Sequence, residues 1–163
     1  MPEITSHATD RPQALRSQAW RLDCEQYPLQ HLLQTRERDL DHQNHVNHVA
    51  VLSYFSEFRA TLHRAWLGGL TEPLDAGDAG SLLVSESVTE FLLSTTYPAP
   101  VTIAARLLAM DQESYRMAAA VFQGGRCTSL QESTVGFQRN GRWSELPKPL
   151  RAEIGRHLSE DAS

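Results

Sequence analysis

The chain has 163 residues, of which 40% are apolar and 21% charged, with 9 glycines and 8 prolines. This length suits one compact domain with a normal core, and the composition excludes collagen-like, disordered and disulfide-scaffold proteins. The formal net charge of −5 repels phosphate backbones, so we expect no nucleic acid partner.

The cysteines and the amino terminus bear on where the protein works. Cys24 and Cys127 form neither a disulfide framework nor a CxxC motif, so we expect a reducing compartment. The first ten residues, MPEITSHATD, lack the basic and apolar regions of a signal peptide, and no apolar run is long enough to cross a membrane. We therefore expect a cytoplasmic protein without a membrane partner.

Residues 1–27 are polar with scattered apolar positions, and we expect a flexible or loosely packed segment there. Residues 28–163 are expected to form a single domain. The run LQHLLQTRER, residues 29–38, mixes apolar and polar side chains without Gly or Pro and predicts the first strand.

The clearest predicted element is a long helix that begins after Asn47. Asn47 is a suitable N-cap and Gly68–Gly69 a suitable end. Val49, Leu52 and Tyr54 widen the apolar sector, which predicts that other elements surround the helix. The main stripe has the three- and four-residue spacing of one helix face and consists of Val51, Phe55, Phe58, Leu62, Ala65 and Trp66.

Four stretches with strand character follow, at residues 81–93, 101–110, 114–123 and 126–139, joined by short turn-forming sequences typical of antiparallel neighbours. A short helix is predicted over residues 147–158. The whole order predicts an α+β fold in which a curved antiparallel sheet of about five strands wraps around one long central helix. The free edges of such a sheet are normally covered, so we expect a homodimer.

The sequence lacks GxSxG, GxxxxGK, GxGxxG, HExxH and CxxC motifs, which weighs against triad esterases, P-loop enzymes, Rossmann oxidoreductases and zincins. Residues 38–48 instead contain two carboxylates and three imidazoles. A carboxylate just upstream of a helix lies near free amides, which keep it ionised and can also polarise a carbonyl. Such a site suits a thioester, because a thiol leaves readily. The alternative is that these side chains only satisfy loop amides.

Metal binding by the three histidines is a further hypothesis, and it corresponds to a metal-dependent hydrolase. His42 and His48 cannot share one helix face, because six helical residues turn through about 600°. We therefore expect no metal site.

The string DLDHQNHVNH (residues 39–48), followed by YFSEFR (residues 54–59), resembles the DxDxxxHVNN…YxxYFEEAR pattern of the hotdog-fold acyl-CoA thioesterases related to 4-hydroxybenzoyl-CoA thioesterase. The resemblance extends over about residues 30–154, where TEFLLSTTYPAPVTI and NGRWSELPKPLRAEI match more weakly. It implies a hotdog homodimer that can assemble into a homotetramer, with active sites between subunits. The implied substrate is an acyl-CoA or acyl-carrier-protein thioester, with no cofactor beyond the coenzyme A of the substrate.

The resemblance also implies roles for residues of the motif. Asp41 matches the catalytic carboxylate, which acts as nucleophile or general base, and the backbone amide near His48 matches the group that polarises the thioester carbonyl. His45 and Asn47 belong to the same candidate site. Asn44 stands where the family usually has Gly, which is tolerable because Asn adopts positive φ readily. His48 replaces the usual second Asn, and Val51 the usual Tyr.

The segment from Arg126 to Arg151 has a net charge of +3 and could bind the phosphates of coenzyme A. Arg126, Arg142 and Lys148 are the candidate substrate-binding residues, with solvated charges at strand ends as the alternative. We expect the acyl pocket to be lined by the helix and by a partner strand around Phe91 and Leu93. A non-catalytic acyl-CoA binding or sensing module remains the alternative function.

Overall fold

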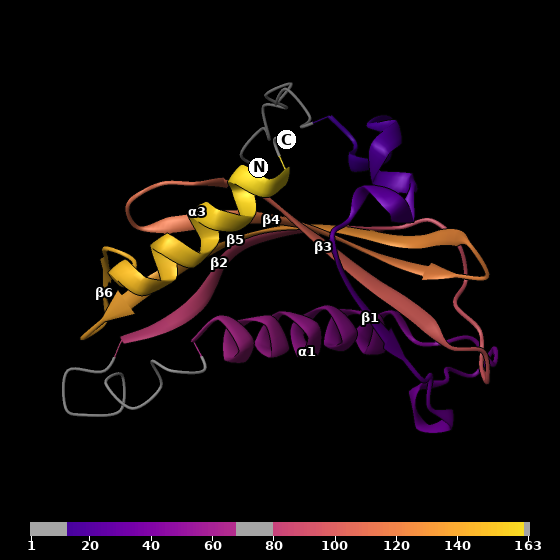
Figure 1. Cartoon of the computed structure of the whole chain (residues 1–163). Helices are drawn as coiled ribbons and strands as arrows, with labels where there is room; N and C mark the ends of the chain where they lie inside the picture. The colour runs from indigo at the N-terminus through magenta and orange to yellow at the C-terminus, as the bar shows by residue number, and fades with distance from the viewer. Residues whose placement is uncertain (1–12, 68–79, 162–163) are drawn as a thin grey trace, which may run out of the picture.

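A computed structural model describes residues 13–67 and 80–161. Its six strands form one antiparallel sheet in the order β1-β3-β4-β5-β2, and β6 extends it by pairing with β5. Figure 1 shows α1 along one face of this sheet. The elements are β1 (Leu29–Leu33), α1 (His48–Leu67), β2 (Gly80–Phe91), β3 (Val101–Met110), β4 (Ser114–Gln123), β5 (Arg126–Arg139), β6 (Arg142–Ser144) and α3 (Lys148–Asp161). This arrangement confirms the predicted hotdog plan of a sheet with one long helix.

Two strands differ from the prediction. β1 ends at Leu33 rather than at residue 38, because Leu33 pairs with Val101, the first residue of β3, and no partner strand continues beyond it. The short strand β6 was not predicted. It forms because Asn140 (φ 51°) and Gly141 (φ 72°) make a tight turn that brings Arg142 opposite Arg139.

The main core lies between α1 and the sheet. Most of the predicted apolar stripe of α1 is buried, and Tyr54 and Phe55 are almost fully enclosed, but Ala65 is exposed and Trp66 is only partly buried. Val49 and Leu52 are exposed, so the prediction that the whole widened sector is covered is wrong for a single chain. The reason is that the sheet and α3 reach only one side of the helix. Of the predicted end of the helix, Gly68–Gly69 lie outside the described residues.

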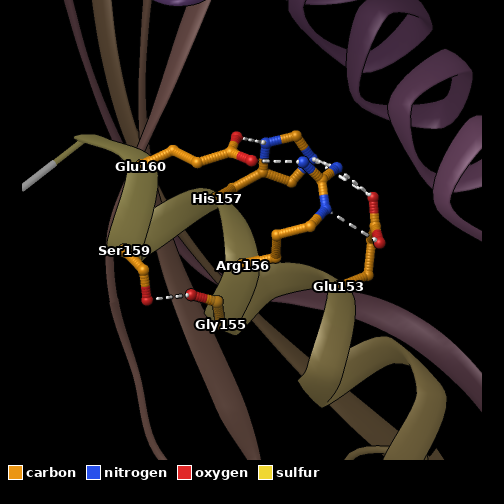
Figure 2. A network of polar contacts seen from close by, with 6 residues as sticks. All are labelled: Glu153, Gly155, Arg156, His157, Ser159 and Glu160. Carbon is orange, nitrogen blue, oxygen red and sulfur yellow. Dashed lines mark hydrogen bonds and ion pairs between the residues drawn. The ribbon is translucent and has the colours of Figure 1, made fainter. Parts of the chain in front are cut away.

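Helix α3 closes the same core at the end of α1. Leu150 and Ile154 are fully buried, and the ring of His157 lies 5.5 Å from that of Trp66 on α1. Next to His157, Arg156 bonds Glu153 and Glu160, each at 2.7 Å, and its guanidinium lies 3.2 Å from Nε2 of His157 (Figure 2). Pairs at this spacing support a helix by a few tenths of a kcal/mol each. None of the described helices has the length and apolar content needed to cross a bilayer.

Residues 13–27 pack on the sheet face opposite α1 as three short 3-10 helices, Leu15–Ser17, Ala19–Leu22 and Cys24–Gln26 (Figure 1). Arg21 is only 4% exposed and donates a hydrogen bond to Glu132 of β5. Glu90 of β2 accepts a hydrogen bond from the amide of Leu15 at 2.7 Å. This part of the predicted N-terminal segment is thus attached to both β2 and β5, while residues 1–12 lie outside the described residues.

Candidate active site

A tight loop carries Asp41 to the start of α1. Leu40 pairs with Val46, and the amide of Asp41 donates to the carbonyl of His45 at 2.8 Å, so the chain reverses direction between them. Asn44 has φ 59°, the left-handed conformation that the sequence predicted at this position. The loop is therefore a compact turn whose shape depends on Asn44.

This turn aims backbone amides at the Asp41 carboxylate. Oδ1 of Asp41 accepts hydrogen bonds from the amides of Gln43 at 2.8 Å and His45 at 3.1 Å. The bonds from His45 and Gln43 lower the pKa of Asp41, so the carboxylate is ionised at neutral pH. Oδ2 accepts no hydrogen bond from the described residues and is free to act on a ligand.

The start of α1 supplies backbone amides that can donate hydrogen bonds to a carbonyl oxygen. Asn47 is the N-cap, as predicted, because its Oδ1 accepts from the amide of Val49 at 2.9 Å. The carbonyl of Asn47 accepts a hydrogen bond from the amide of Val51 at 3.1 Å. Within the described chain, the amides of His48 and Ala50 have no acceptor outside the helix, as is usual for the first turn. These amides and the helix dipole favour negative charge at this point.

A cavity of about 320 Å³ lies at this junction. Its walls come from the Asp41 loop, the start of α1, the end of β2 with the segment after it, and β5. The amide of Val46 donates to the carbonyl of Thr95 at 2.8 Å, and Leu92 donates to Thr128 at 2.8 Å, so these walls are tied together. The lining residues are Asp41, Gln43, His45, Val46, His48, Val51, Phe91, Leu92, Leu93, Ser94, Thr95 and Ser129.

The two aspartates of the motif have different surroundings. Asp39 does not line the cavity and instead accepts hydrogen bonds from Tyr54 at 2.7 Å and Arg36 at 2.9 Å. Burial acts to raise the pKa of Asp39, but the bonds from Tyr54 and Arg36 outweigh it and leave the pKa lowered. Asp39 therefore anchors the loop to α1, and Asp41 is the carboxylate that faces the cavity.

The other predicted site residues separate into two groups. His45 and His48 line the cavity with Asp41, and the His48 ring packs edge-on against Phe91 with ring centres 5.9 Å apart. Asn47 is absent from the lining and acts through the helix cap. Phe91 and Leu93, the residues expected at an acyl pocket, also line this cavity.

The predicted cationic residues do not form one cluster within a chain. Arg126 begins β5, whereas Arg142 pairs opposite Arg139 at the far end of that strand. The length of the extended strand separates these ends by roughly 40 Å. Lys148 begins α3, beyond β6. Of these three residues, only Arg126 lies near the turn between β4 and β5. Gln123, at the other side of this turn, hydrogen-bonds to Thr96, which follows Thr95 of the cavity wall.

The sequence reasoning missed Ser129 and Thr95 as lining residues. A serine within a strand carries no signal of its own, and its relevance emerges only from the register that sets it opposite Phe91. Among residues 13–67 and 80–161, no three His, Cys, Asp or Glu side chains converge on a possible metal site.

Comparison with known families then identifies the chain. Residues 35–156 match the thioesterase-like superfamily. The chain belongs to this superfamily. Among curated proteins no match was found.

Solved structures share the fold of this thioesterase-like protein. A thioesterase from Thermus thermophilus, complexed with coenzyme A and Zn, is 23% identical with a TM-score of 0.70, over 83% of this chain and 98% of that one. A hypothetical protein from Staphylococcus aureus in complex with CoA is 15% identical with a TM-score of 0.73, over 80% and 83%. A putative thioesterase from Pseudomonas aeruginosa is 22% identical with a TM-score of 0.64, over 77% and 96%.

Proposed function

We propose that the protein hydrolyses the thioester of an acyl-CoA or an acyl-carrier protein to a free acid and a thiol. One observation carries the proposal: an ionised carboxylate with a free oxygen, Asp41, lines the same cavity as the acceptor-free helix start at His48. Membership of the thioesterase-like superfamily supports the choice of bond, and the coenzyme A in two related structures supports the leaving group.

The reaction follows from these two groups. The thioester oxygen accepts a hydrogen bond from the amide of His48, where the helix dipole stabilises the negative charge of the tetrahedral intermediate. Oδ2 of Asp41 either takes a proton from the attacking water or attacks the carbonyl carbon itself. Collapse breaks the C–S bond and releases the thiolate, which needs no strong acid because its pKa is about 8.5. In the second route, water then hydrolyses the acyl-aspartyl anhydride.

Single-turnover hydrolysis in ¹⁸O-labelled water distinguishes the two routes. With the enzyme in excess, label in the peptide that contains Asp41 indicates attack by Asp41, because water that cleaves the mixed anhydride at Cγ leaves its oxygen on the aspartate. A general base leaves all label in the released acid, and so does water that attacks the acyl carbon of the anhydride. Added borohydride separates these two cases, because it reduces an acyl-aspartate and changes the mass of the peptide. Mass spectrometry of this peptide gives the answer.

We assign residues in and beside the cavity to the acyl and coenzyme parts of the substrate. Phe91 and Leu93 present an exposed apolar wall for the acyl group. Arg126, exposed at the same end of the sheet, is the candidate for a phosphate of coenzyme A. Arg142 and Lys148 would contact the same coenzyme only from another subunit, because they lie at the opposite end of β5.

The deciding experiment compares Asp41→Asn with Asp111→Asn. Asp111 is a matched control, because its Oδ1 also accepts two loop amides, from Glu113 at 2.8 Å and Ser114 at 2.7 Å, yet it lines no part of the cavity at Asp41. We expect Asp41→Asn to lower kcat by about 100-fold or more in a thiol-release assay over an acyl-CoA panel. Asp111→Asn should keep kcat within about twofold.

Three other outcomes have defined meanings. If the wild type binds acyl-CoA but releases no thiol, the non-catalytic binding module replaces the enzyme. If chelation abolishes activity and added metal restores it, the protein is a metal-dependent hydrolase and the proposed mechanism is wrong. If both Asn variants lose activity equally, Asp41 has only a structural role.

A further inference from the structure

Ser129 holds a buried hydroxyl that lacks a partner. The residue is 1% exposed, and its Oγ makes no hydrogen bond with any described residue. Nearby polar side chains differ in this respect, since Thr95 bonds Thr128 at 3.0 Å and Gln131 bonds Thr89 at 3.0 Å. Buried hydroxyls in folded proteins nearly always have a partner, so this group needs one that the chain itself does not supply.

The strand register places the Ser129 side chain on the face of the sheet that carries the cavity of Asp41. Ser129 lies opposite Phe91 on β2 and opposite Val121 on β4. Phe91 packs against His48, and Val121 belongs to the core beneath α1, so both side chains are on the α1 face. The next residue, Leu130, belongs to the core on the other face. Because side chains alternate along a strand, Ser129 points toward α1, and it is part of the cavity lining.

The surroundings of Ser129 indicate which part of a ligand would reach it. Its cross-strand neighbour Phe91 is an apolar part of the cavity lining, while the charged group, Asp41, comes from the loop. In the proposed function, the thioester oxygen already has the amide of His48. The atom left to meet Ser129 therefore belongs to the acyl group, close to the thioester carbon, because the cavity is small.

We propose that Ser129 is a specificity-determining residue that selects short acyl groups carrying a hydroxyl or oxo oxygen near the thioester. This inference rests on the proposed thioesterase function and names its substrate class. The Ser129 hydroxyl donates to a carbonyl oxygen or exchanges a hydrogen bond with a hydroxyl. A saturated acyl group leaves Ser129 unsatisfied and so binds the transition state less well.

The test compares 3-hydroxybutyryl-CoA with butyryl-CoA, which differ by one hydroxyl. We expect wild-type kcat/KM to be at least about tenfold higher for the hydroxylated substrate. Ser129→Ala should remove this preference by lowering kcat/KM for 3-hydroxybutyryl-CoA alone. Ser133→Ala is the matched control, because Ser133 is equally buried on the same strand face but does not line the cavity. It should preserve the preference.

Two further measurements keep the result decisive. Because the hydroxyl of Ser129 has no partner in the chain, Ser129→Ala should leave Tm unchanged or higher; a lower Tm together with unchanged selectivity would mean that the hydroxyl is structural and overturn the inference. Equal loss on both substrates would also overturn it, since Ser129 would then act on the thioester. If the wild type hydrolyses neither substrate but cleaves others in the acyl-CoA panel, the inference about Ser129 is overturned and the proposed function stands. If it cleaves none of the panel, the proposed function fails, and calorimetric binding of the same pair to wild type and Ser129→Ala still decides the selectivity.

Discussion

Asn44 shows how one backbone conformation supports the chemistry of another residue. Its positive φ lets the loop turn back, so that the amides of Gln43 and His45 both reach Oδ1 of Asp41. A side chain with a Cβ branch or no local polar group resists this conformation, whereas glycine accepts it freely.

We therefore predict opposite results for two substitutions of Asn44. Asn44→Gly should keep stability and kcat near the wild-type values. Asn44→Val should lower the free energy of unfolding by about 1–2 kcal/mol and lower kcat, because the amides that hold Asp41 move away. Urea denaturation and the thiol-release assay measure both effects. Equal behaviour of the two variants would show that the turn does not depend on φ at Asn44.

At the level of single residues, the sequence predicts positions whose role is local. The N-cap at Asn47 and the left-handed Asn44 follow from side-chain chemistry within a few residues, and the structure confirms both. Ser129 could not be predicted, because its burial and its missing partner depend on strand pairing across three elements.

At the level of elements, periodicity and turn residues predict α1, α3 and strands β2 to β5, because each has a strong local pattern. β1 is shorter than predicted, since a strand ends where its partner ends and not where its own propensity ends. The 3-10 helices of residues 13–27 have no period to detect, and their placement depends on distant partners such as Glu90 and Glu132.

Helix α1 also contains a partly buried histidine that makes stability depend on pH. His63 bonds the hydroxyl of Tyr115 on β4, and its ring packs 6.2 Å from that of Trp66. Burial, together with nearby Arg59, lowers the pKa of His63 from 6.5 to about 4. The unfolded chain therefore binds a proton between these pH values that the folded chain does not, and stability falls as pH falls from 6.5 toward 4.

We predict that His63 contributes up to about 3 kcal/mol to this loss. In His63→Gln, the free energy of unfolding from urea titrations should fall less steeply between pH 6.5 and about 4 than in the wild type. His42→Gln is the control, because His42 is exposed in the Asp41 loop, and it should follow the wild-type slope. Identical slopes in all three proteins would contradict burial of a neutral imidazole.

At the level of the whole molecule, one edge of the sheet is incomplete. β2 is an outer strand, and it exposes the apolar side chains Leu83, Val84 and Val88. Exposed apolar edges of this length are normally covered, so the predicted homodimer would form here, with β2 of each subunit continuing the other's sheet. This pairing would also bring a second chain to Phe91 at the cavity.

We predict that Val88→Lys, which introduces a charge on this edge, shifts the protein from dimer to monomer in light-scattering measurements at micromolar concentration. Leu32→Lys is the control, because Leu32 is 68% exposed on β1 at the opposite edge of the sheet. It should leave the mass unchanged. A loss of dimer only in Leu32→Lys would place the interface on β1.

The central position of β5 has a consequence for the dynamics of the molecule. This strand pairs with β4, β2 and β6, and its two faces contact the core beneath α1 and the N-terminal segment. Amide hydrogens along β5 should therefore exchange with deuterium only through global unfolding, whereas outward amides of β2 exchange through local opening. Amides of β5 beneath the candidate site should therefore exchange only when the whole protein unfolds. The exchange rate of the outward amides of β2 beside the site would measure subunit association directly.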